Sequence, residues 1–223
     1  MKAKKTALHI ISLLIFLFST CYAAAEKEDD YTETQILLLG TPHLKNLGNK
    51  ETKLHYRLTR NGSKPFKGSA VGDIGERAAD GGRDASYTFT YDDNKKTFPK
   101  VLGFRSNPLI MFFLEWDLDE TLKTTTNKHS KTALRNKARL AMWKNADVAD
   151  IFITHNKKTY PAKRIKLAPY LDNNRDDPVK TRRYEFILSE AIPGGFQSLS
   201  SHYDTDGEKI TTLVIYDHAE EPK

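Results

Sequence analysis

Cysteine, proline and glycine are all scarce in this chain. Its 223 residues include one cysteine, nine prolines and 12 glycines. With so little proline and glycine and no short repeat, the sequence excludes a collagen-like or low-complexity protein, and no longer repeat has the spacing of a solenoid. Hydrophobic residues make up 39% of the chain, which is enough for one compact core of ordinary size.

The chain also lacks a hydrophobic run of the roughly 20 residues that a membrane-spanning helix needs. An apolar run over residues 8–18 follows three lysines within the first five residues and precedes three alanines at 23–25. This order of basic, apolar and small residues is typical of a secretory signal peptide. We therefore expect residues 1–25 to be a signal peptide, the protein to reach the periplasm, and no transmembrane span to remain.

The single cysteine leaves one alternative open. A lipoprotein would be cut just before Cys21 and acylated there, but the preceding Phe-Ser-Thr differs from the usual lipoprotein box. We therefore expect Cys21 to be removed with the signal peptide. The processed chain would then have no disulfide, no thiolate nucleophile and no cysteine ligand for a metal.

Short catalytic and cofactor motifs are absent as well. None of the seven histidines has HExxH or His-x-His spacing, and no G-x-S-x-G, Walker or dinucleotide-binding pattern occurs. We therefore predict a non-enzymatic protein with no catalytic residues and no cofactor.

The hydrophobic pattern predicts strands on both sides of a helical pair. Alternating apolar and polar residues predict strands near 54–58, 87–91, 98–104, 151–153, 164–167, 183–188 and 210–216. The glycine-rich residues 62–85 indicate a long loop or a strand pair. Helical spacing predicts one helix from Asn107-Pro108, with Met111, Leu114, Leu118 and Leu122 as its apolar stripe, and a second over 131–144.

Because strands do not alternate with helices, the expected fold is α+β. It would be mainly antiparallel β, either a sandwich or a bent sheet, with the helical pair inserted. We expect residues 26–53 to be a polar leader with a short apolar run, and residues 54–223 to form a single domain.

Four carboxylates cluster in the first predicted helix, at Glu115, Asp117, Asp119 and Glu120. The second helix carries five cations and no acid. We therefore predict structural ion pairs that join Glu115 and Asp117 to Arg135 and Arg139. The alternative is an enzyme or a metal-dependent site, built from the 115–120 acidic cluster and scattered histidines. The sequence leaves the metal unknown.

A second charge cluster is basic. Residues 157–183 contain nine Lys or Arg and three Asp, whereas the chain without its first 25 residues has a net charge of only +3. The overall charge does not indicate nucleic-acid binding, but the local excess indicates a surface for an anionic envelope component or an acidic protein. The residues expected to bind this partner are Lys163, Arg164, Lys166, Arg182 and Arg183.

Several short motifs follow one another in a recognisable order. These are Asn107-Pro108, the FLEWD segment at 113–117, the RNKARLA segment at 135–141 and the YEFILSEAIPG segment at 184–194. In these motifs the chain resembles a group of uncharacterised exported bacterial proteins, over roughly residues 85–200. The resemblance implies a periplasmic domain of unknown function and brings no catalytic residue with it.

Overall fold

The computed structural model describes residues 31–62, 64–124, 130–144, 146–173, 178–205 and 207–221. Residues 32–223 form one compact unit. The predicted signal peptide, with Cys21, lies outside the described residues. No helix in the described part of the chain is long and apolar enough to cross a membrane.

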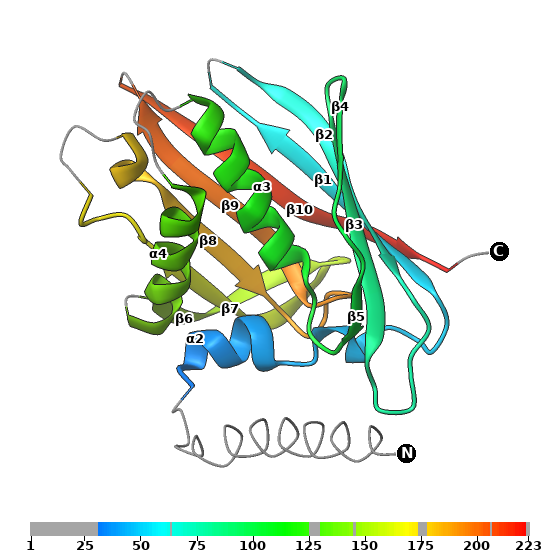
Figure 1. Ribbon diagram of the computed structural model, residues 1–223. Coiled ribbons are helices and arrows are strands. Elements are labelled where there is room, and N and C mark those ends of the chain that lie inside the picture. Colours follow the sequence, from blue (N-terminus) through cyan, green and yellow to red (C-terminus); the bar gives the residue numbers. More distant parts are fainter. Residues whose placement is uncertain are drawn as a thin grey trace, which may run out of the picture. The chain divides into compact units, whose positions relative to one another are not determined.

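Ten antiparallel strands form a single curved sheet (Figure 1). Its order is β4-β3-β2-β1-β10-β9-β8-β7-β6, and β5 also pairs with β3. The strands are β1 (Thr52–Arg60), β2 (Phe66–Ile74), β3 (Arg83–Tyr91), β4 (Asn94–Thr97), β5 (Val101–Phe104), β6 (Asp147–His155), β7 (Lys158–Leu167), β8 (Arg183–Leu188), β9 (Phe196–Thr205) and β10 (Glu208–Glu220). The predicted α+β fold is confirmed, and the sheet is bent rather than split into a sandwich.

Two long helices are inserted between β5 and β6, as the sequence predicts. They are α3 (Leu109–Thr124) and α4 (Lys131–Lys144). Figure 1 shows α3 lying across the sheet and α4 beside it. The Asn107 side chain begins α3, because its Oδ1 accepts a hydrogen bond from the Leu109 backbone N–H at 3.0 Å.

The core lies between α3 and the inner face of the sheet. Trp116 on α3 is fully buried, and its ring is 5.4–6.3 Å from the rings of Phe66, Phe89, Tyr91 and Phe113. Of the predicted apolar stripe only Leu118 is fully buried. The helix therefore turns a different side to the sheet, because the aromatic residues beside that stripe provide more apolar surface to bury.

The compact unit begins at Thr32, earlier than the boundary at 54 that the sequence predicts. Its first elements are the short helices α2 (Glu33–Gln35), η1 (Ile36–Gly40) and η2 (His43–Asn46). Thr32 and Gln35 form a capping box at the start of α2. Leu38 and Leu44 are buried in the common core, so the apolar run of the expected leader is part of the domain.

Candidate functional site

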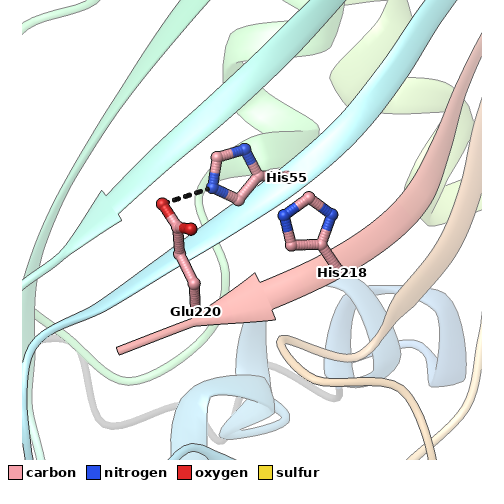
Figure 2. Close-up of side chains that lie close together, drawn as sticks. All are labelled: His55, His218 and Glu220. Carbon is pink, nitrogen blue, oxygen red and sulfur yellow. Dashed lines mark hydrogen bonds and ion pairs between the residues drawn. The ribbon is translucent and has the colours of Figure 1, made fainter. Parts of the chain in front are cut away.

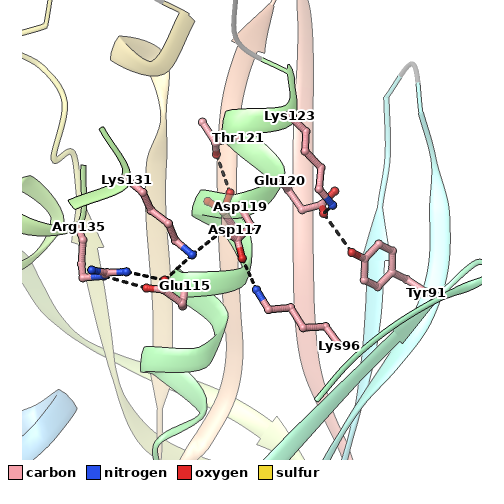
Figure 3. A network of polar contacts seen from close by, with 10 residues as sticks. All are labelled: Tyr91, Lys96, Glu115, Asp117, Asp119, Glu120, Thr121, Lys123, Lys131 and Arg135. Atoms are coloured by element: carbon pink, nitrogen blue, oxygen red, sulfur yellow. Dashed lines mark hydrogen bonds and ion pairs between the residues drawn. The ribbon is translucent and has the colours of Figure 1, made fainter. Parts of the chain in front are cut away.

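The acidic cluster on α3 was the first candidate site, and Figure 3 shows its contacts. Arg135 donates two hydrogen bonds to Glu115, from Nε at 2.9 Å and from Nη2 at 2.7 Å. Lys131 lies between Glu115 and Asp119 and pairs with both, and Lys96 also pairs with Asp119. The hydrogen bond from Arg135 is the main reason that the pKa of Glu115 lies below its usual value.

Glu120 is paired on another side of the same helix. Its carboxylate accepts hydrogen bonds from Lys123 Nζ at 2.7 Å and from Tyr91 Oη at 3.0 Å, and Arg60 lies 3.5 Å away. Burial favours the neutral acid, but these partners outweigh it, so the pKa of Glu120 is lowered.

Asp117 points in the opposite direction, into the core. It is fully buried and accepts hydrogen bonds from Arg182 Nη1 at 2.6 Å, Tyr184 Oη at 2.9 Å and Ser201 Oγ at 2.8 Å. Burial and the charge of Asp117 together raise the pKa of the Tyr184 hydroxyl. This network joins α3 to β8 and β9.

These contacts correct the expected ion pairs. Asp117 pairs with Arg182 and not with Arg139, which is exposed. The reason is helical geometry, since Asp117 is two residues from Glu115 and therefore faces away from α4. All four carboxylates of the cluster have cationic partners, so their geometry indicates a structural role.

A broad hollow on the other side of the sheet is the stronger candidate. Tyr184 on β8 and Ser201 on β9 point inward to Asp117. Because side chains alternate along a strand, their neighbours Arg183 and His202, which are opposite each other in the sheet, face outward. The hollow has a volume of about 930 Å³. Its walls come from β7, β8, β9, β10 and the short helix η3 (Pro178–Thr181).

Four cations line this hollow: Lys166, Lys180, Arg183 and Lys209. Lys166 has a loose ion pair with Glu185 at 3.8 Å. Arg183 donates from Nη1 to the backbone carbonyls of Lys180 at 2.8 Å and of Arg182 at 3.0 Å. Lys180, Arg183 and Lys209 form no ion pair with any carboxylate in the described part of the chain.

His202 forms part of the floor between these cations. Its Nε2 lies 3.1 Å from Ser200 Oγ, and its Nδ1 lies 3.0 Å from Thr211 Oγ1. Burial, followed by the charge of Lys209, lowers the pKa of His202. The imidazole is therefore a neutral, fixed part of the floor at neutral pH, and the positive charge comes from the lysines and Arg183.

The five predicted partner-binding residues do not all lie together. Lys166 and Arg183 line the hollow, and Arg164 is on the same face of β7 as Lys166 but half-buried. Lys163 is on the opposite face, where it pairs with Glu33 at 3.2 Å and Asp150 at 2.9 Å. Arg182 is only 3% exposed, so it belongs to the core and cannot contact a partner.

Two further residues of the hollow, Lys209 and His202, were not predicted from the sequence. Lys209 is distant in sequence from the basic stretch, but the β9–β10 hairpin places it opposite Asp204 on β9, the strand that pairs with β8. His202 lies on β9, a strand that the sequence did not predict. An Asp-Gly turn just before the predicted strand 210–216 was the available signal for this hairpin.

The comparisons with known proteins add little to this picture. No protein-family model matches the chain, and no curated protein matches it. Among solved structures, the chain is similar to a β-barrel-like protein of domain of unknown function DUF1849 from Brucella abortus. The TM-score is 0.36 and the identity 10%, over 78% of this chain and 98% of that chain. At this similarity we transfer neither a function nor a site residue.

Proposed function

We propose that this chain is a non-enzymatic binding or accessory protein of the bacterial periplasm. Its outward hollow on β7–β10 would receive an anionic group of an envelope component or of an acidic protein. The observation that carries the proposal is the set of three cations, Lys180, Arg183 and Lys209, which line one hollow without a carboxylate partner in the described residues.

Electrostatics supports an anionic ligand at this place. Like charges gathered in a concave surface repel one another, and the low-dielectric walls strengthen their field. An anion that enters the hollow relieves this repulsion and gains three charge-assisted contacts. Elsewhere, Lys131 and Arg135 of α4 already have carboxylate partners on α3, so they offer less to a ligand.

The mixed lining indicates what kind of anion fits. Three carboxylates, Asp147, Glu185 and Asp204, also line the hollow. A dense polyanion such as a nucleic acid would meet these carboxylates along with the cations, whereas a single headgroup or acidic side chain would not. Leu171 at the rim is 51% exposed, so the partner would bring an apolar part beside its charge.

The periplasmic location is part of the same proposal. It rests on the signal-peptide pattern of residues 1–25 and on the resemblance to exported proteins described above. Anionic phospholipid headgroups and acidic proteins are both present in that compartment. A binding assay with one probe of each kind distinguishes between them.

A binding assay with defined probes tests the proposal. The purified chain is mixed with vesicles that contain phosphatidylglycerol, with pure phosphatidylcholine vesicles, and with immobilised polyglutamate, each at low salt and at about 0.5 M salt. We expect retention on one anionic probe, with loss at high salt. Equal retention on phosphatidylcholine, or no retention on either anionic probe, would contradict the proposal.

A further inference from the structure

Two histidines and a glutamate lie together on the outer face of β1 and β10, away from the hollow. His55 on β1 is directly opposite His218 on β10, and Glu220 follows His218 by two residues. Leu54 and Tyr56, the neighbours of His55, are buried in the core, so His55 points outward. Figure 2 shows the three side chains side by side.

Their donor atoms are close enough to share one ion. His55 Nε2 lies 3.1 Å from a carboxylate oxygen of Glu220, and one donor from each residue falls within 4.8 Å of the other two. Ligands about 2.0–2.2 Å from a tetrahedral Zn²⁺ lie roughly 3.3–3.5 Å from one another. The imidazoles are stacked, with centroids 4.3 Å apart, so binding requires their planes to tilt until the nitrogens converge.

A neighbouring carboxylate orients one of the histidines. His218 Nδ1 lies 2.9 Å from Asp217 Oδ2, and Arg57 lies 3.7 Å from the other oxygen of Asp217. Histidines that bind metals commonly bond their second ring nitrogen to a carboxylate in this way. This bond at Nδ1 leaves Nε2 of His218 as the free donor.

The other charged side chains nearby leave the Glu220 carboxylate accessible to a metal ion. Lys53 is opposite Glu220 in the β1–β10 register, but its ammonium pairs with Asp73 on β2 at 3.9 Å. The side chains of His218 and Glu220 are 54% and 52% exposed, so both can move to meet an ion.

We propose that His55, His218 and Glu220 form a binding site for a divalent transition-metal ion, with Zn²⁺ as the best fit. Two imidazole nitrogens and one carboxylate suit a borderline ion such as Zn²⁺, while Ca²⁺ and Mg²⁺ prefer oxygen ligands alone. Three protein ligands leave a fourth position for water or for a group of a partner.

A bound ion would also join the two strands at the end of the sheet. The pairing of β9 with β10 ends at Ile215, and beyond it Tyr216 and residues 218–220 of β10 pair with β1. An ion held by His55 from β1 and by His218 from β10 would cross-link this end. Since the ion binds the folded chain, it should raise the melting temperature.

The site is tested by metal titration of the full chain. The protein is first treated with a chelator and dialysed. We expect calorimetry to give one equivalent of bound Zn²⁺, with a higher melting temperature that chelator reverses. Co²⁺ should give the absorption bands of a four-coordinate centre. A calorimetric stoichiometry below half an equivalent of Zn²⁺ would overturn the proposal. An unchanged melting temperature at saturating Zn²⁺ would also overturn it.

Matched variants locate the ion. His218→Gln and Glu220→Gln should each lower Zn²⁺ affinity at least tenfold, and Asp217→Asn should lower it by roughly 10–100-fold through the orientation of His218. Glu221→Gln is the control, because it makes the same charge change one residue away. Full affinity in His218→Gln, or an equal loss in Glu221→Gln, would place the ion elsewhere.

Discussion

Asp117 accepts its three hydrogen bonds while fully buried, and among the described residues Arg182 is the cation that balances its charge. Burial disfavours the charged guanidinium, yet the pKa of Arg182 lies above its ordinary value because Asp117 outweighs that effect. Removing either partner of such a pair leaves an unpaired charge in the core.

Asp117→Asn should therefore be among the most damaging conservative substitutions in the chain. The amide keeps the shape of the side chain but not its charge, so Arg182 would remain buried without a counter-ion. We expect the free energy of unfolding to fall by about 3–5 kcal/mol, measured by urea denaturation. Arg139→Gln, at an exposed position on α4, is the control and should change stability by less than about 0.5 kcal/mol.

A double variant separates the charge effect from loss of packing. Asp117→Asn combined with Arg182→Met removes both buried charges, so the combination should be less destabilising than the sum of the two single changes. If the losses in the free energy of unfolding were additive, Asp117 and Arg182 would not stabilise each other, which would contradict the buried ion pair in the structure.

Local sequence could suggest some of these partners and not others. Glu115 and Arg135 are on consecutive helices, and their opposite charges were visible in the sequence. Asp117 and Arg182 are joined only when α3 lies across β8 and β9, which is a tertiary arrangement. The sequence of the basic stretch also does not distinguish Arg182 from Arg183. In the structure Arg182 points into the core, whereas Arg183 points outward.

At the scale of elements, the turn between β8 and β9 depends on two glycines. Gly194 and Gly195 have φ angles of 77° and 83°, a conformation that side chains disfavour. A Cβ atom on Gly195 would also lie 2.4 Å from Nδ1 of the His43 ring. His43 in turn is held by Leu37, whose carbonyl oxygen is 2.6 Å from Nε2.

We expect Gly195→Ala to be more destabilising than Gly207→Ala. Both positions have a positive φ, so each change should cost about 1–2 kcal/mol from backbone strain. At Gly207 no atom lies within 4 Å of the added Cβ, whereas at Gly195 the His43 ring must also move. Urea denaturation of the two variants measures the difference, and equal losses would refute the steric contribution of His43.

The acidic face of α3 makes a prediction about pH. The pKa values of Glu115, Asp119 and Glu120 are all below their usual range. A carboxyl group with a lower pKa in the folded state binds fewer protons there than in the unfolded chain. It therefore stabilises the fold above the unfolded pKa of about 4, and this stabilisation is lost as the pH falls through the lower folded value.

The free energy of unfolding should thus decrease as the pH falls below about 4. The double variant Glu115→Gln/Asp119→Asn should show a shallower decrease in this range, measured by urea denaturation at several pH values. Burial lowers the pKa of His43, so a separate decrease should begin near pH 6.5 and be shared by both proteins. Parallel curves below pH 4 would contradict the role of these ion pairs.

Helices and strands with a regular hydrophobic pattern were predictable from the sequence. Strands in which glycine or serine interrupts that pattern were harder to predict. The predicted helix 131–144 and strand 183–188 match α4 and β8. For the glycine-rich stretch 62–85 the sequence left a long loop and a strand pair open, and the structure has the strand pair, β2 and β3. Gly68 and Gly72 lie inside β2, where a Cβ would meet Thr90 and Tyr87 of β3. β9 was missed because serines at 198, 200 and 201 obscure its alternation.

For the whole molecule, the decisive contacts join distant parts of the chain. β1 pairs with β10, which brings together His55 and His218, and β9 pairs with β10, which brings Lys209 to the basic hollow. Sequence spacing alone could not predict either meeting, because sheet order depends on how all ten strands pack around α3. The sheet thus has the buried pair of Asp117 and Arg182 on its inner side, and on its outer face the cations of the hollow, three of which have no carboxylate partner among the described residues.

The measurement that tests the central claim most directly is the affinity of matched charge variants for phosphatidylglycerol vesicles and polyglutamate. The triple variant Lys180→Gln/Arg183→Gln/Lys209→Gln removes the three cations of the hollow that have no carboxylate partner in the described residues. The control Lys67→Gln/Lys95→Gln/Arg139→Gln removes three exposed cations from β2, β4 and α4, with the same change in net charge.

At about 1 kcal/mol for each cation beside an anionic surface, the first variant should bind the preferred probe roughly a hundredfold more weakly. The control should keep most of its affinity, because none of its three charges lines the hollow. An equal loss in both variants would show that net charge alone drives binding, and unchanged affinity in the first would show that the hollow is not the site.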